Sequence, residues 1–145
     1  MKYPKYPVFA SENPFIYEFF SEGPRGKIRK AVFYTKIGSN LYNLGFGDWN
    51  EELQDVDDSN RTNNGDRDQV LATVAATAIT FTNHFPDAEI FVQGSTPART
   101  RLYQMGIGYN LLEINEHFHV RGFTDDDWEA FQHGRNYSAL LINRK

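Results

Sequence analysis

Residues 94–101, Gly-Ser-Thr-Pro-Ala-Arg-Thr-Arg, combine side-chain types that bind anions. We expect a buried strand to end at this glycine and a helix to begin directly after it. Such a turn directs free backbone N–H groups, the positive end of the helix dipole and two hydroxyls at one point. Arg99 and Arg101 stand near the start of that helix, where a positive charge is unfavourable unless an anion is close by. The pattern predicts a phosphate or carboxylate site. Its residues are Gly94, Ser95, Thr96, Arg99 and Arg101.

The segment is neither of the two common phosphate-binding loops. It lacks the second Gly and the Lys-Ser/Thr pair of the P-loop, and it does not have the spacing of the dinucleotide fingerprint. A second interpretation stays open, in which Ser95 and Thr96 only cap the helix and the arginines pair with the acidic residues of 48–68. Asn64 and Asp66, at the start of an earlier expected helix, complete the predicted ligand-binding set.

Carboxylates and histidines are the other residues that could do chemistry. Glu18, Asp48 and Asp66 are conceivable ligands of a two-metal nuclease site, but the first strand lacks the central Asp that a ribonuclease H-like enzyme needs. His117 and His119 would share one face of a strand. The chain has no cysteine and only four histidines, too few for a closed metal site. We predict no structural metal and no cofactor, and we assign no catalytic residue.

The composition indicates an ordinary globular protein. The chain has 145 residues, of which 40% are hydrophobic and 23% charged, and we expect one domain over residues 1–145. Its first residues lack an apolar segment of the length found in signal peptides. No run of apolar residues approaches transmembrane length. We therefore expect a cytoplasmic protein that does not bind a membrane.

The charge distribution bears on the kind of partner. The formal net charge is −4, which disfavours nucleic acid. Residues 27–36 nevertheless alternate basic and apolar residues. They are either an edge strand protected by its charges or an RNA surface with Phe33 and Tyr34 as stacking rings. We expect a phosphate-bearing small molecule as the partner, and the sequence leaves the oligomeric state open.

Hydrophobic periodicity and turn residues predict an α/β (α+β) fold. The predicted strands are 14–22, 27–37, 41–49, 88–94 and 136–145, and the predicted helices are 66–85, 95–106 and 124–134. Residues 110–123 are expected to form a turn of helix and then a strand. An antiparallel β-meander therefore precedes α-β-α units, in a mixed sheet covered by helices. A ribonuclease H-like topology is the alternative, because it shares the opening order β-β-β-α-β-α.

Local signals set the details of these elements. Gly45 and Gly47 indicate a bulge or a close approach in the third strand. Asp66 and Gln69 have the spacing of a capping box. The polar loop 50–65 is long, and we expect it to be the most mobile internal segment. In the second helix the expected apolar stripe is Ala98, Leu102 and Met105, ended by Gly106 or Gly108.

Three stretches, LGFGD, TNNGDRDQVLATVA and GSTPARTRLYQMGI, resemble an uncharacterised family of small bacterial proteins, a domain of unknown function. The likeness extends over nearly the whole chain, with GSTPARTRLY and LATVA as its motifs. It implies a single-domain, cytoplasmic bacterial protein. It implies no activity and no catalytic residue, so function has to be argued from the residues themselves.

Three classes of function follow. The first is a binding or regulatory protein that uses the turn at 94–101 as a site for phosphate or a nucleotide. The second is a small nuclease or nucleotide-processing enzyme, with Arg99, Arg101 and acidic residues between Asp48 and Asp66. The third is a protein–protein partner in a two-gene module, with the aromatic strands as its surface.

Overall fold

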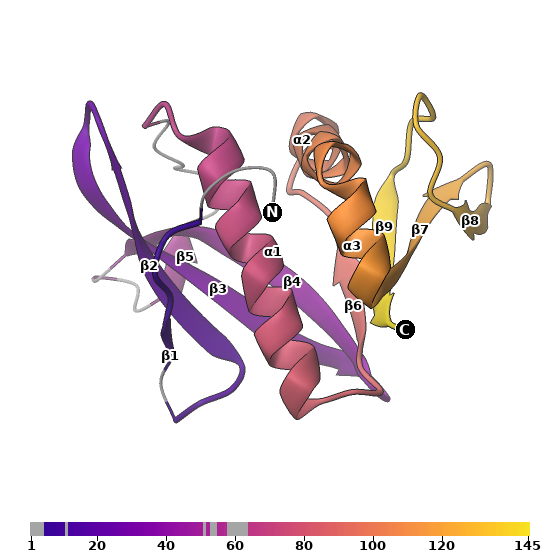
Figure 1. Ribbon diagram of the computed structural model, residues 1–145, viewed down its shortest axis with the longest axis horizontal. Coiled ribbons are helices and arrows are strands. Elements are labelled where there is room, and N and C mark those ends of the chain that lie inside the picture. Colours follow the sequence, from indigo (N-terminus) through magenta and orange to yellow (C-terminus); the bar gives the residue numbers. More distant parts are fainter. Residues whose placement is uncertain (1–4, 11, 51, 53–54, 58–63) are drawn as a thin grey trace.

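One sheet holds all the strands of the described part of the chain (Figure 1). The computed structural model describes residues 5–10, 12–50, 52, 55–57 and 64–145. The strands there are β1 (Phe9–Ala10), β2 (Ile16–Gly23), β3 (Gly26–Gly38), β4 (Leu41–Asn50), β5 (Asp55–Asp57), β6 (Glu89–Val92), β7 (Phe118–Thr124), β8 (Asp127–Ala130) and β9 (Ala139–Arg144). The helices are α1 (Arg67–His84), α2 (Pro97–Tyr109) and α3 (Leu111–His117).

The order of the strands makes the sheet mixed. From one edge to the other it is β1-β2-β3-β4-β6-β9-β7-β8, and β5 pairs with the end of β4. The start of β4 runs parallel to β6, whereas the other strand pairs of the described residues are antiparallel. The predicted meander and mixed sheet are confirmed. The opening order β-β-β-α-β-α, which the ribonuclease H-like alternative shares, is present, with β1 and β5 as short additions.

All three helices lie on the same face of the sheet (Figure 1). The strands turn buried side chains toward them, as Tyr17 and Phe19 of β2 do. Tyr34 of β3 stacks on Phe81 of α1, with ring centroids 4.1 Å apart, and its hydroxyl is 2.7 Å from the Thr77 hydroxyl. Burial raises the pKa of the Tyr34 phenol well above its ordinary value. An aromatic layer therefore holds α1 on the meander.

The strand β3 differs from the sequence-based expectation in two ways. It lies between β2 and β4, so the interpretation of residues 27–36 as an edge strand is wrong. The irregularity in its pairing with β4 lies between Lys36 and Gly38, and the predicted bulge at Gly45 and Gly47 is absent, because both glycines pair in regular register. Gly47 is opposite Ala31, which is fully buried.

Residues 124–134 do not form the predicted helix. The chain turns at Asp125 and Asp126, with φ of 50° and 66°, and returns as β8. Two consecutive positive φ values are typical of a two-residue hairpin turn, and Asp tolerates them better than most residues. Phe123 and Trp128 face each other across the hairpin, with ring centroids 5.2 Å apart. This cross-strand pair outweighs the local helix signal.

The ends and faces of the helices also differ in detail. Asp66 precedes α1 as predicted, but its side chain makes no capping bond, so the capping box does not form.

Gly106 and Gly108 lie inside α2, which continues to Tyr109. At Gly106 a Cβ atom would lie 2.8 Å from Leu71 Cδ1, so this glycine allows α2 to contact α1 rather than ending the helix. The buried face of α2 is Thr100, Tyr103, Gln104, Gly106 and Ile107, not the predicted stripe.

The predicted loop 50–65 contains one described strand, β5, on β4. Residues 51, 53–54 and 58–63 lie outside the described residues. The expectation that this loop is the most mobile internal segment therefore stays a prediction.

Candidate functional site

The turn from β6 into α2 has the predicted geometry. β6 ends at Val92, and Thr96 is the N-cap of α2, its hydroxyl accepting a hydrogen bond from the Arg99 N–H at 3.2 Å. The Gly94 N–H donates to Thr100 Oγ1 at 2.9 Å. A Cβ atom on Gly94 would lie 2.6 Å from the Thr100 nitrogen. The absence of a side chain at Gly94 therefore allows the first turn of α2 to lie close to the end of β6.

A groove opens beside this turn, and we call it the α2 groove. It is lined by residues 93–98, Thr100, Arg101, residues 123–125 and residues 136–138, and its volume is about 730 Å³. It therefore lies where the end of β6, the start of α2, the end of β7 and the segment before β9 meet. These segments are distant in sequence, and only the first two could be placed together from local signals.

The two arginines of the predicted site have different surroundings. Arg101 lines the α2 groove, and its Nη1 donates to Asn136 Oδ1 at 3.0 Å. Among the described residues, no carboxylate pairs with Arg101. The Arg99 side chain turns back along the chain, where its Nη1 donates to Ser95 Oγ at 2.5 Å, and Arg99 is not part of the groove lining.

Asn64 and Asp66 lie in a polar network with the β2–β3 hairpin, outside the α2 groove. The Asp66 carboxylate accepts hydrogen bonds from the Tyr6 hydroxyl at 2.6 Å and the Ser21 hydroxyl at 2.5 Å. The Asn64 side chain donates to the Gly26 carbonyl oxygen at 2.9 Å. Burial, followed by the hydrogen bond to Asp66, raises the pKa of Tyr6. These contacts give both residues a structural role in holding α1 to the hairpin.

The carboxylates considered for a two-metal site do not converge. Glu18 lies on the helix-free face of the sheet, where it pairs with Arg29 at 2.5 Å. Asp48 is paired with Lys30 on the opposite face, also at 2.5 Å, and both of these side chains are largely buried. His117 ends α3 and His119 belongs to β7, so they do not share one strand. The geometry gives no support to a nuclease centre built on these residues.

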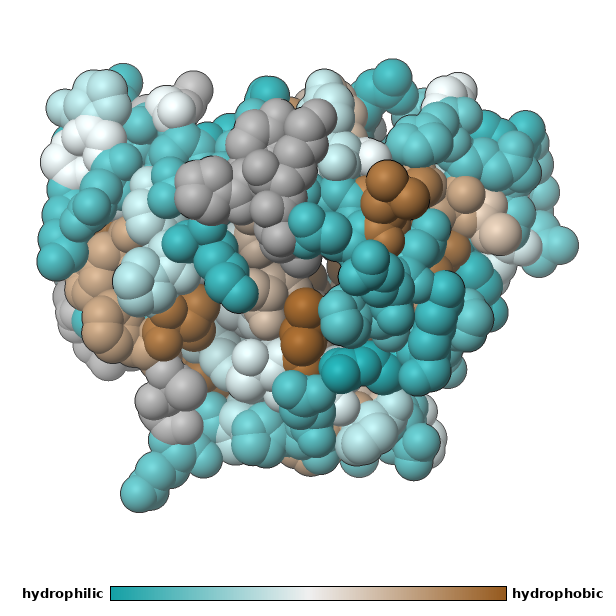
Figure 2. Space-filling model, in the orientation of Figure 1, coloured by the Kyte–Doolittle hydropathy of each residue, from teal (hydrophilic) through white to brown (hydrophobic). Residues whose placement is uncertain are grey.

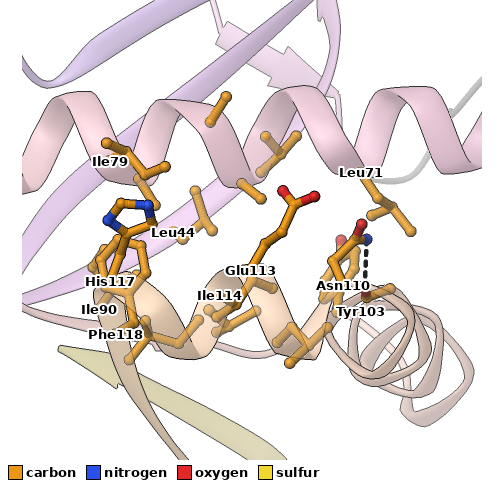
Figure 3. Close-up of a pocket in the computed structure, with 18 of the residues that line it drawn as sticks. Leu44, Leu71, Ile79, Ile90, Tyr103, Asn110, Glu113, Ile114, His117 and Phe118 are labelled. Carbon is orange, nitrogen blue, oxygen red and sulfur yellow. Dashed lines mark hydrogen bonds between the residues drawn. The ribbon is translucent and has the colours of Figure 1, made fainter. Parts of the chain in front are cut away.

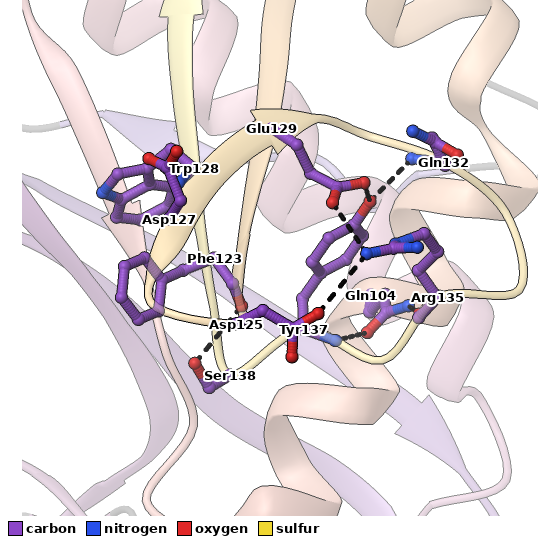
Figure 4. A network of polar contacts seen from close by, with 10 residues as sticks. All are labelled: Gln104, Phe123, Asp125, Asp127, Trp128, Glu129, Gln132, Arg135, Tyr137 and Ser138. Carbon is purple, nitrogen blue, oxygen red and sulfur yellow. Dashed lines mark hydrogen bonds and ion pairs between the residues drawn. The ribbon is translucent and has the colours of Figure 1, made fainter.

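A polar network that sequence reasoning missed holds the outer wall of the α2 groove (Figure 4). The Tyr137 N–H donates to Gln104 Oε1 at 3.1 Å, and its hydroxyl donates to Glu129 Oε2 at 2.9 Å. Arg135 pairs with Glu129 at 3.0 Å, and the Gln104 amide donates to the Arg135 carbonyl oxygen. Burial raises the pKa of Tyr137, and the Glu129 carboxylate adds to the rise. The only sequence signal was Gln104, a polar residue on what proves to be the buried face of α2.

A second concavity, which we call the α1–α3 cleft, lies between α1 and α3 on the helix-covered face. It has a volume of about 500 Å³ and a mostly apolar lining. Figure 2 shows apolar atoms at the surface in the middle of this face. No sequence motif indicated it.

Residues 2–145 match the model of a family of unknown function, DUF6934. The chain belongs to this family. The resemblance to a family of unknown function is thereby confirmed over residues 2–145, and it carries no activity to any residue of this DUF6934 member. No curated protein and no solved structure matches the chain. None of the helices in the described part combines the length and the apolar character that crossing a lipid bilayer requires.

Proposed function

We propose that this DUF6934 member is a binding protein with a regulatory role, and that its ligand carries an anionic group held in the α2 groove. The observation that carries the proposal is the position of Arg101. Its guanidinium lines the groove with Asn136, a neutral side chain, as its hydrogen-bond partner. Because α2 is three turns long and starts at the same groove, its positive end adds to the attraction.

Backbone donors at the groove support the same ligand class. Ser95, Thr96 and Ala98 line it, and among the described residues no group accepts a hydrogen bond from their backbone N–H groups. The first N–H groups of a helix have no partner within the helix, and anions satisfy them well. Phe123 adds an aromatic side chain to the lining. A phosphate ester with an organic body, such as a nucleotide, therefore suits the groove better than a bare ion.

Nucleic acid is less well suited than a small molecule. Asp125 stands on the opposite wall of the groove with its side chain 90% exposed. Its charge opposes a polymer that is negative along its whole length. We therefore expect a small ligand whose one anionic group lies at the start of α2 and whose remaining atoms lie near Phe123.

Calorimetric titration tests the proposal with inorganic phosphate, adenosine mono- and diphosphate, and a short RNA. Arg101→Gln is expected to weaken binding of the phosphate compounds by roughly three- to tenfold, since it removes one partly screened charge-assisted contact. The matched control is Arg67→Gln, because Arg67 begins α1, is 56% exposed and is not part of the groove lining. Absence of binding by the wild type, or equal losses in the two variants, would refute the anion site.

A second candidate function is binding of a protein partner to the helix-free face of the sheet. Phe9 is 58% exposed there, and Phe33 and Trp49 stack with ring centroids 6.1 Å apart. Arg29 lies over the Trp49 ring and pairs with Glu18, so this face is aromatic without being strongly basic. That combination favours a protein over RNA. Sedimentation analysis with the product of a neighbouring gene tests it, and Phe9→Asp is expected to weaken any complex.

A further inference from the structure

The lining of the α2 groove is more polar than that of the α1–α3 cleft. The cleft is lined mainly by apolar side chains, among them Leu44, Ile79 and Ile90 (Figure 3). The groove presents several hydroxyl and amide side chains, and every residue of its lining lies within the described segment 93–138. Polar and charged groups therefore contribute more to the selection of a ligand in the groove than in the cleft.

Two charged side chains line the α2 groove, one positive and one negative. Arg101 belongs to α2, and Asp125 belongs to the turn between β7 and β8. They stand on opposite walls of the groove, and the other residues of the lining carry no formal charge. One charge of each sign makes the groove dipolar, whereas a site for a simple anion would gain from positive charge on both walls.

The charge of Asp125 has only a loose partner among the described residues. The Asp125 carboxylate is 3.8 Å from Arg135 Nη2, whereas the same nitrogen is 3.0 Å from the Glu129 carboxylate (Figure 4). Glu129 therefore holds the Arg135 guanidinium more closely than Asp125 does. The side chain of Asp125 is also 90% exposed. A cationic group of a ligand can thus approach this carboxylate without displacing a tight ion pair.

The β7–β8 turn accounts for the backbone of Asp125 but not for its charge. The φ angle is 50° at Asp125 and 66° at Asp126. Asn and Gly adopt such angles at least as readily as Asp, and they carry no charge. Both aspartates serve the turn, but of the two only Asp125 lines the groove. The negative charge at position 125 is therefore a feature of the groove rather than a requirement of the turn.

We infer that the α2 groove binds a zwitterion, a small molecule whose anionic group lies against Arg101 and whose ammonium group lies against Asp125. The inference rests on the anion site proposed above and adds the second charge of its ligand. The ligand chemistry is an amine joined by a short organic body to a phosphate ester or a carboxylate. Each charge of such a molecule meets an opposite charge in the groove. A ligand with the anionic group alone would meet the repulsion of Asp125.

Two pairs of probes test the inference, and the members of each pair differ by one ammonium group. O-phosphoethanolamine is compared with ethyl phosphate, and β-alanine is compared with propionate. Calorimetric titration is carried out at about pH 8, above the second pKa of a phosphate ester, which is about 6. At low salt we expect the amine to bind roughly two- to fivefold more tightly in at least one pair, as for an exposed ion pair. High salt should reduce the preference, and the pair that shows it identifies the anionic group.

Asp125→Asn isolates the contribution of the charge, because Asn tolerates the same positive φ. This variant should lose the preference for the amine and should bind ethyl phosphate and propionate at least as tightly as the wild type. Asp126→Asn is the matched control, since it makes the same change in the same turn but outside the groove lining, and it should keep the preference. Thermal melting of both variants checks that the fold is intact.

The outcomes distinguish this inference from the anion site on which it rests. Binding of ethyl phosphate or propionate with no gain from the ammonium group would overturn the zwitterion and leave the anion site in place. A gain that survives Asp125→Asn, or one that is lost equally in Asp126→Asn, would do the same. Absence of binding by all four probes would overturn both.

Discussion

Replacing Gly94 with alanine should destabilise the protein through the contact between the β6–α2 turn and the helix. The new Cβ would lie 2.6 Å from Arg99 Cβ and 2.6 Å from the Thr100 nitrogen. These distances are about 1 Å shorter than ordinary contacts between non-bonded atoms. Such overpacking costs about 1–3 kcal/mol, and a weakened Gly94–Thr100 hydrogen bond adds about 1 kcal/mol. The smaller entropy of the unfolded alanine chain offsets about 0.4–1 kcal/mol.

The net expectation is a loss of about 1–3 kcal/mol in the free energy of unfolding. For a chain of this length, 1 kcal/mol corresponds to about 3 °C in Tm. Urea denaturation and thermal melting measure both quantities, and phosphate titration reports on the α2 groove. Gly45→Ala is the control, because in the described part of the chain the added Cβ would come no closer than 4.0 Å to a non-adjacent residue, at Asn43 Nδ2. If Gly94→Ala is as stable as Gly45→Ala and binds phosphate as the wild type does, the close approach at the turn does not hold α2 in place.

Two further predictions concern stability. Burial raises the pKa of Tyr34 above the unfolded value of 10.0, so the stability that this phenol contributes is complete below about pH 10 and is lost as the pH rises further. Urea denaturation at a series of alkaline pH values should show that decline, and it should be shallower in Tyr34→Phe. Lys30→Met should lower the free energy of unfolding by about 3 kcal/mol, because it removes the ammonium partner of the largely buried Asp48 carboxylate. The double variant Lys30→Met with Asp48→Asn should be less destabilised than Lys30→Met alone, because it also removes the buried negative charge. A double variant at least as unstable as the single one would argue against the buried pair.

Local signals were sufficient for the meander, for α1 and for the start of α2. The Thr96-Pro97 pair places an N-cap and a first helical residue in succession, and the structure has both. The prediction of a helix at 124–134 was wrong because the deciding interaction is the pairing of Phe123 with Trp128 across a turn. The spacing of apolar residues predicts only local structure, so it cannot show that a hairpin is more favourable than a helix here.

The candidate site shows the same division between near and distant contacts. The turn geometry at 94–101 depends on neighbours in sequence and was predictable. The partner of Arg101 is Asn136, which is 35 residues away, and no local pattern could indicate it. Asp66 was placed in the ligand set, but Tyr6 and Ser21 occupy its carboxylate. The α1–α3 cleft is lined by segments that are distant in sequence, so no local pattern could indicate it.

The position of β9 between β6 and β7 has a consequence for synthesis of the chain. On a ribosome β6 is made about fifty residues before β9, so its edge toward β9 stays unpaired in the meantime. Ile90, Phe91 and Val92 make that edge apolar and β-prone, which favours association with other nascent chains. α2 and α3 are made in this interval, but they can cover only one face of the strand. Chaperone capture at β6 during translation would therefore protect this protein until residues 139–144 arrive.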